Sequence, residues 1–152
     1  MAAFLPAPGE TALKPTNKYP GSTLPDALDP TPFTLPSGGK GTDLYIKADK
    51  FRHQFAADVP AGTGATRRPI AQSALEEKTE VAAWWDKPSW DVITTQDLNI
   101  PANVQRFMAK RAGAHGTEVR ASHSVAVSHP GTDLCVRVGR GGSSAVAAVP
   151  FR

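Results

Sequence analysis

The hydrophobic and polar positions are most regular between residues 88 and 130. Residues 90–95 (WDVITT) form a short run rich in β-branched and apolar residues, which predicts a buried strand. Apolar residues then recur at i, i+3, i+4 and i+8, which predicts an amphipathic helix over 101–112: Val104, Phe107, Met108 and Ala112. Residues 117–120 predict a second short strand.

The ends of this helix carry their own signals. Pro101 lacks an N–H and has a fixed φ, which suits the first turn of a helix. Lys110 and Arg111 place positive charge at the carboxyl end of the helix dipole, and Gly113 suits a left-handed exit. A strand, a crossover helix and a second strand predict two parallel neighbours whose carboxyl ends share one edge of a sheet.

An acid and a histidine follow these two strands. Asp97 comes directly after the first strand and His123 just beyond the second, so the topology predicts that they meet. A carboxylate that fixes the tautomer of an imidazole leaves the other ring nitrogen free to take a proton from a hydroxyl nucleophile. The order acid before histidine is that of α/β-hydrolases. The spacing alone leaves a second interpretation open, in which Asp97 caps a turn and His123 is a surface residue.

The segment 96–130, QDLNIPANVQRFMAKRAGAHGTEVRASHSVAVSHP, resembles the C-terminal part of bacterial α/β-hydrolases of the esterase and hydroxynitrile-lyase-like branch. In that branch the acid lies in a D-x-x-I-P loop, matched here by Asp97, Ile100 and Pro101. The histidine follows a serine, matched by Ser122 and His123. The resemblance implies an α/β fold and assigns catalytic roles to Asp97 and His123.

The similarity extends upstream through TDLYIKADKFRHQFAADVP to AAFLPAPGE and implies four parts. Residues 1–10 would be the end of a core strand, and residues 11–80 a small and mostly helical cap. Residues 81–138 would hold the C-terminal parallel core strands, their flanking helices, and the loops that carry the acid and the histidine. Residues 139–152 would be a divergent tail, which we expect to be poorly ordered. Glycines in the tail oppose the helix with which the family would end.

Within the expected cap, the pattern predicts a hairpin and two helices. Residues 32–35 and 42–46 are strand-like runs around a glycine-rich turn. Phe51, Phe55 and Val59 share one face of a predicted helix over 49–59. A second helix is predicted over 67–78.

The nucleophile of the family is missing from this sequence. No G-x-S-x-G turn occurs, and the resemblance places it, with the oxyanion hole, upstream of Met1. The run from Gly141 to Ala145 (GGSSA) is only a loose imitation that follows His123 and precedes no helical pattern. Cys135, the single cysteine, lies in an apolar run typical of a small buried residue.

The resemblance therefore implies a hydrolase of small ester or carbonyl compounds that is inactive as this chain alone. A different class of function stays open: a non-catalytic interaction module, whose exposed sheet edge needs a second copy or a partner chain. A gene fragment without a stable fold is the third possibility.

The composition limits which kinds of molecule the chain is expected to bind. The chain has 152 residues and a net charge of +3, and its charges are scattered, which does not favour nucleic-acid binding. A single cysteine permits no internal disulfide and predicts the reducing cytoplasm. No apolar run is long enough to span a membrane. The four histidines lack metal-ligand spacing, so we expect neither a metal nor a cofactor.

Overall fold

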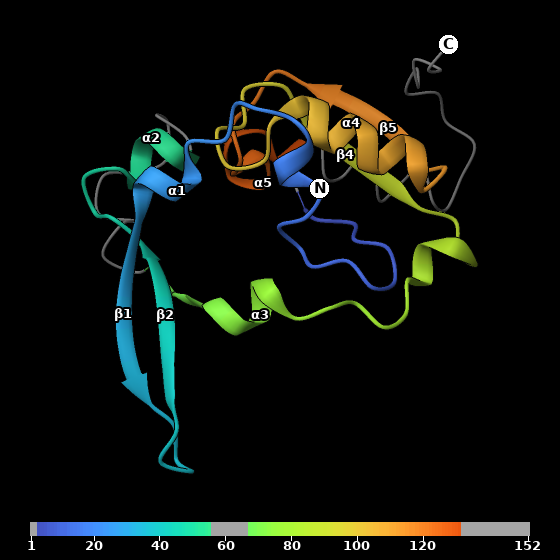
Figure 1. Cartoon of the computed structure of the whole chain (residues 1–152). Helices are drawn as coiled ribbons and strands as arrows, with labels where there is room; N and C mark the ends of the chain where they lie inside the picture. Colours follow the sequence, from blue (N-terminus) through green and yellow to red (C-terminus); the bar gives the residue numbers. More distant parts are fainter. Residues whose placement is uncertain (1–2, 56–66, 132–152) are drawn as a thin grey trace.

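The computed structural model describes residues 3–55 and 67–131 (Figure 1). The elements follow one another in this order: η1 (Thr16–Lys18), α1 (Leu24–Ala27), β1 (Leu28–Thr34), β2 (Lys40–Ile46), α2 (Phe51–Phe55), β3 (Ile70–Ala71), α3 (Gln72–Glu76), η3 (Ala83–Trp85), β4 (Trp90–Thr94), α4 (Ala102–Arg111), β5 (His115–Val119) and α5 (Val125–Ser128). Cys135, the GGSSA run and the expected tail lie outside the described residues.

The β4–α4–β5 unit is the centre of the fold and confirms the predicted parallel pair. β4 and β5 pair in parallel, with Trp90 opposite His115 and Thr94 opposite Val119. The predicted strand over 117–120 thus begins two residues earlier than the pattern indicated. Helix α4 follows Pro101 and ends before Gly113, whose φ of 60° is the left-handed conformation expected of a glycine at this exit.

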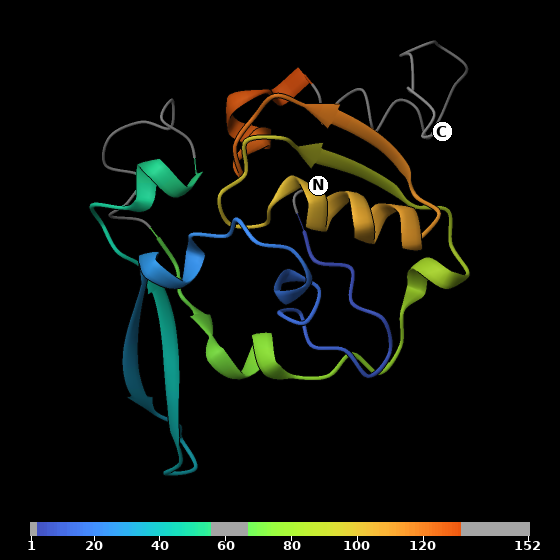
Figure 2. The ribbon, with the colours of Figure 1, turned by 45° about the horizontal axis from the view of Figure 1, so that its top comes forward.

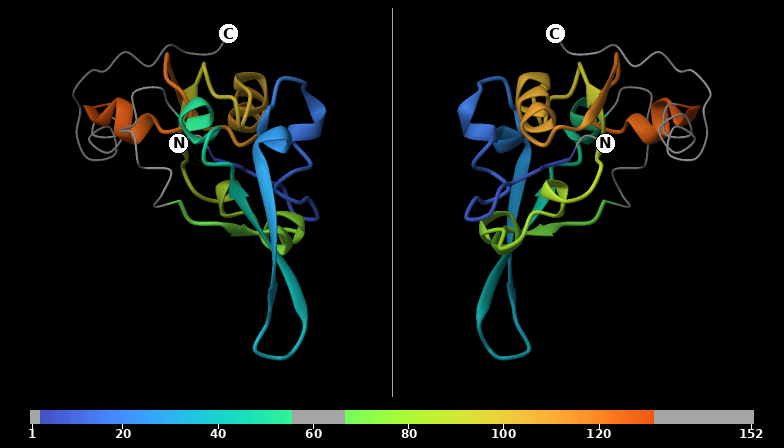
Figure 3. Two further views of the ribbon diagram at one scale, coloured as in Figure 1. Left: turned by 90° about the vertical axis from the view of Figure 1, so that its left-hand side faces the viewer. Right: turned by 90° about the vertical axis from the view of Figure 1, so that its right-hand side faces the viewer.

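Buried apolar side chains lie on both sides of this unit. On one side, α4 contributes Val104 and Met108, which pack with Ile100. On the other, Val92 of β4 packs against Val125 of α5. Figure 3 shows α4 and α5 on opposite sides of the β4–β5 pair. Because β4 is covered on both faces, it is buried along almost its whole length, as the short run of β-branched and apolar residues predicted.

A second, antiparallel sheet has the order β1–β2–β3, and its long hairpin projects away from the β4–β5 unit (Figure 1). The hairpin is longer than the sequence predicted, because β1 begins at Leu28 and includes Pro30 and Pro32. A proline cannot donate to a sheet ladder, so two prolines at alternate positions keep the outer edge of β1 from pairing with a further strand.

The prediction of one helix over 67–78 is wrong in its first part. Ile70 and Ala71 form β3 and pair with Leu44 and Asp43 of β2, and the helix covers only 72–76. Pro69 disfavours the helical region for Arg68, and Ile70 and Ala71 are extended because they pair with β2. The helix predicted over 49–59 begins two residues later than expected, as α2, and its last four residues lie outside the described part of the chain. The region expected as a mostly helical cap also contains this sheet.

The N-terminal segment, residues 3–10, forms no strand and instead packs on α4 and on the stretch after α3 (Figure 2). Arg111 holds it from α4, with one guanidinium nitrogen 2.8 Å from the Glu10 carboxylate and another donating to the Leu5 carbonyl. The Trp84 indole donates to the Pro6 carbonyl at 3.2 Å. The N-terminal segment is thus held against α4 and η3, which lie far from it in the sequence.

Candidate active site

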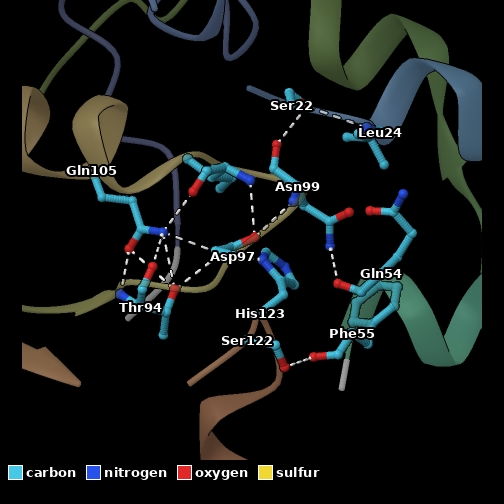
Figure 4. Close-up of polar contacts among 11 residues, drawn as sticks. Ser22, Leu24, Gln54, Phe55, Thr94, Asp97, Asn99, Gln105, Ser122 and His123 are labelled. Carbon is cyan, nitrogen blue, oxygen red and sulfur yellow. Dashed lines mark hydrogen bonds and ion pairs between the residues drawn. The ribbon is translucent and has the colours of Figure 1, made fainter. Parts of the chain in front are cut away.

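Asp97 and His123 meet at the carboxyl edge of the parallel pair, as the sequence predicted. Asp97 lies on the loop after β4, and His123 lies beyond β5. Nδ1 of His123 is 2.8 Å from Oδ2 of Asp97 (Figure 4). The Asp97 side chain is fully buried, whereas that of His123 is 24% exposed. The geometry therefore joins a fixed acid to an imidazole that reaches the surface.

Donors surround both oxygens of the Asp97 carboxylate. Oδ1 accepts from the backbone amides of Asn99 at 2.8 Å and Ile100 at 3.0 Å. Oδ2 accepts from the Thr94 hydroxyl at 3.0 Å and from the Gln105 amide at 3.1 Å. The first two contacts make a tight turn that positions the start of α4, because Asp side chains bond to amides two and three residues on.

These donors define the tautomer of His123. An ionised carboxylate only accepts hydrogen bonds, so Nδ1 of His123 is the donor in their 2.8 Å contact. The neutral ring then carries no proton on Nε2, and no hydrogen bond to Nε2 is found among the residues that the structure describes. His123 thus presents a proton-accepting nitrogen away from Asp97.

Thr94 and Gln105 are site residues that the sequence reasoning missed. Gln105 is only 1% exposed and lies on α4 between the apolar positions Val104 and Met108. A polar residue on the core-facing side of a predicted helix is the signal that points to it, because a buried amide needs partners. Nothing in the spacing of the sequence indicates Thr94, the last residue of an apolar strand.

The end of α2 packs on the histidine loop. The carbonyl of Phe55 accepts hydrogen bonds from the Ser122 hydroxyl and, at 3.1 Å, from the Ser124 amide. The Phe55 ring meets the His123 ring edge-on, with centroids 5.2 Å apart and planes at 77°. One wall beside the imidazole is therefore aromatic and belongs to the region that the sequence predicted as the cap.

The other three described histidines lie outside the site. His115 lies against the Trp90 ring at 5.4 Å, and Nδ1 of His129 contacts the Ser128 hydroxyl at 2.9 Å. His53 is exposed on α2. Within the described ranges, 3–55 and 67–131, no group of acidic, histidine and cysteine side chains is arranged to hold a metal ion, and no helix is both long and apolar enough to cross a membrane.

The clear pKa shifts fall on ion pairs outside the site. The Ala7 amide and the Arg111 guanidinium hold the pKa of the Glu10 carboxyl below its usual value. The hydrogen bond between Arg106 and Glu118 lowers the pKa of Glu118 and raises that of Arg106. These pairs tie the N-terminal segment and β5 to α4.

A cavity of about 690 Å³ lies elsewhere, between the N-terminal third of the chain, the hairpin and α3. Five leucines contribute to its wall: Leu13, Leu24, Leu28, Leu44 and Leu75. Neither Asp97 nor His123 lines it. Its nearest link to the acid loop is Ser22, whose hydroxyl donates to the Asn99 carbonyl at 2.8 Å. We therefore treat the acid–histidine pair and not this cavity as the candidate active site.

The fold and the pair together define part of an α/β-hydrolase fold, in which an acid and a histidine follow neighbouring parallel strands. The solved structures that the chain resembles include polyneuridine aldehyde esterase, with a TM-score of 0.68 and 14% identity over 89% of this chain, and a histidine-to-alanine variant of it, with 0.70 and 13% over 93%. A pyrethroid hydrolase from Sphingobium faniae JZ-2 gives a TM-score of 0.61 and 22% identity over 91%.

The chain spans only part of these structures: 60% and 58% of the two esterase chains and 57% of the pyrethroid hydrolase. No model of a known protein family and no curated protein matches the sequence. At these identities the likeness establishes the fold alone.

Proposed function

We propose that the chain is the acid-and-histidine part of a hydrolase acting on small ester or related carbonyl compounds. Asp97 is the acid that orients the imidazole, and His123 is the general base. The observation that carries the proposal is the 2.8 Å contact between them at the carboxyl edge of adjacent parallel strands. The esterase and hydrolase names of the similar structures support the class of substrate.

In the proposed reaction, Nε2 of His123 takes the proton of a serine hydroxyl as its oxygen attacks the carbonyl carbon. The same nitrogen then returns the proton to the leaving alcohol, which leaves the acyl group on the serine; His123 next takes a proton from a water that attacks this acyl group and returns it to the serine oxygen as the acid is released. Asp97 stabilises the imidazolium that exists between these two steps. The serine lies outside these residues in our proposal, because the sequence contains no G-x-S-x-G turn. The chain alone is then inactive, since the oxyanion hole belongs to the same missing part.

Hydrolysis of a short-chain p-nitrophenyl ester tests both claims. We expect this chain to show no more turnover than its His123→Ala variant. A chain extended upstream in the same reading frame, through a strand and a G-x-S-x-G turn, should hydrolyse the ester. That activity should fall by roughly a thousandfold or more in Asp97→Ala and His123→Ala. His115→Ala, which changes an exposed histidine outside the site, is the matched control.

Two outcomes would contradict the proposal. Turnover by the unextended chain that disappears in both variants would mean that a nucleophile is present here after all. Full activity of the extended chain in both variants would remove the acid and base roles of Asp97 and His123.

A second candidate is a non-catalytic module that assembles with another copy of itself. Exposed apolar side chains favour it, since Val81 is 82% exposed and Trp85 63%. β5 also has only one strand neighbour among the described residues, so its outer edge can pair. Light scattering after size-exclusion chromatography separates the candidates. A dimer supports assembly, and a monomer with a sharp thermal transition contradicts it.

A further inference from the structure

We infer that Gln105 is the positioning residue of the acid: its amide sets the direction of the Asp97 carboxylate, and through it the tautomer of His123. The catalytic meaning of this role rests on the function proposed above. The role itself is a property of the hydrogen bonds among α4, the end of β4 and the acid loop.

The amide of Gln105 can lie in only one orientation. Its Oε1 is 3.0 Å from the backbone nitrogen of Thr94, a donor that only an oxygen can face. Its Nε2 is 2.7 Å from the Ile100 carbonyl and 3.1 Å from Oδ2 of Asp97, two acceptors that only a nitrogen can face. Exchanging the two ends would set the NH₂ group against the Thr94 amide and the oxygen against the Ile100 carbonyl and Oδ2 of Asp97. The side chain is only 1% exposed, so water could not replace these three lost hydrogen bonds.

This fixed amide determines where Oδ2 of Asp97 lies. Oδ2 accepts hydrogen bonds from Nε2 of Gln105 at 3.1 Å and from the hydroxyl of Thr94 at 3.0 Å, both on the same side (Figure 4). Two backbone amides hold the other carboxylate oxygen, so the group cannot rotate without losing several bonds at once. The direction that remains at Oδ2 is filled by Nδ1 of His123.

The requirement is specific for glutamine. A leucine of similar size would leave the Thr94 amide and the Ile100 carbonyl without this partner in a buried place. A glutamate would set a second carboxylate oxygen against Oδ2 of Asp97 and the Ile100 carbonyl. Only a side chain with an acceptor at one end and a donor at the other fits both contacts.

The nitrogen resonances of His123 in the ¹⁵N-labelled full chain test this role, because they report which ring nitrogen carries the proton. We expect the wild-type chain to show the Nδ1–H tautomer. In Gln105→Leu the ratio of this tautomer to the other should fall about tenfold, the equivalent of one lost charge-assisted hydrogen bond.

Gln54→Leu is the matched control. Gln54 is also buried, at 2% exposed, but its amide donates to the hydroxyl and the carbonyl of Thr23. We expect this variant to lose a buried amide and yet keep the wild-type tautomer of His123. An unchanged tautomer in Gln105→Leu, or an equal change in Gln54→Leu, would overturn the inference.

A variant that fails to fold still leaves a decisive measurement. The side-chain NH₂ of Gln105 in the wild-type chain should exchange slowly with solvent, and the nearly isosteric Gln105→Glu should shift the tautomer as Gln105→Leu does. Rapid exchange of that NH₂, or a wild-type chain without dispersed resonances, would overturn the inference. The tautomer is read without substrate, so an extended chain with no esterase activity would count against the proposed function and leave this result standing.

Discussion

Nδ1 of His123 lies 2.8 Å from Oδ2 of Asp97, although 26 positions separate the two residues in the sequence. The contact follows from the parallel register of β4 and β5, which brings the loops after both strands to one edge. Asp97 is buried among donors and His123 is partly exposed. A held acid beside an accessible base is the arrangement that proton transfer to and from a substrate requires.

Replacing Asp97 with asparagine should destabilise the fold as well as the pair. An asparagine has one acceptor oxygen, so its NH₂ group must face either two backbone amides or the donors around Oδ2. We expect Asp97→Asn to lower the free energy of unfolding by about 1–3 kcal/mol, the cost of buried donors without acceptors. Urea denaturation measures it. Asp86→Asn, at an exposed aspartate, should change the value by less than about 0.5 kcal/mol, and equal effects would contradict the prediction.

The Glu10–Arg111 pair predicts a fall in stability on acidification. The Ala7 amide, and then Arg111, keep the pKa of Glu10 below its usual 4.5 in the folded chain. A carboxyl group whose pKa is lower when folded contributes stability above the unfolded value and loses it as the pH falls through the folded value. Glu10→Gln should therefore lower the free energy of unfolding at neutral pH by about 0.5–1.5 kcal/mol.

The same variant should also show a shallower fall in stability below the usual pKa of Glu10. Urea denaturation across a pH series measures both effects. A slope identical to that of the wild-type chain would mean that the Glu10 contact does not distinguish the folded from the unfolded state.

The Arg106–Glu118 pair should matter less, although its geometry is good. Two nitrogens of Arg106 donate to the two carboxylate oxygens of Glu118 at 2.7 and 2.8 Å, which ties α4 to β5. Both side chains are more than a third exposed, at 37% and 40%, so water screens the pair. We expect Glu118→Gln to cost less than about 1 kcal/mol and the difference from wild type to shrink in high salt. A cost that salt does not change would contradict this view.

The extent to which the sequence predicts this structure depends on whether each feature has a period. α4 is predictable because its apolar residues recur at helical spacing and because Pro101 and Gly113 mark its limits, and β4 and β5 are predictable as short strand-like runs on either side of it. β3 has only two residues, too few to show any alternation, and its existence depends on pairing with β2. The local sequence pattern alone therefore predicted a helix across the residues of β3.

Some residues of the site were likewise predictable from the sequence, and others were not. Asp97 and His123 were predictable because the loops after adjacent parallel strands must lie close together. Thr94 and Gln105 support the acid through hydrogen bonds that depend on the distance between β4 and α4 and on side-chain rotamers. Spacing along the chain carries no information on either quantity. The contact of Phe55 with His123 was beyond the sequence for the same reason.

Met108 should be the most costly apolar residue of α4 to truncate. Its side chain is fully buried, packs with Ile100 and Val104, and lies with its sulfur 3.2 Å from the Leu5 amide. Met108→Ala should cost about 2–5 kcal/mol, because the neighbours collapse only partly into the space left. It should also speed hydrogen exchange at Leu5. Val127→Ala, at a 62% exposed position, is the control, and a comparable loss there would contradict the account.

Phe55 should control how freely the His123 ring is reached. The two rings meet edge to face at 5.2 Å, and the Phe55 carbonyl also accepts from the Ser122 hydroxyl next to the histidine. Phe55→Ala keeps that carbonyl but removes the aromatic wall, so we expect the imidazole to become more mobile and more exposed. Its rate of modification by diethyl pyrocarbonate should rise several-fold, followed by mass spectrometry of the His123 peptide.

Phe55→Leu should restore most of the protection, because an apolar side chain still covers the ring. Phe33→Ala, in the projecting hairpin, should leave the rate at His123 unchanged and shows whether any loss of an aromatic residue has the same effect. If Phe55→Ala also left the rate unchanged, the aromatic contact would have no part in shielding the base. Access to His123 would then depend on the acid loop and the histidine loop alone.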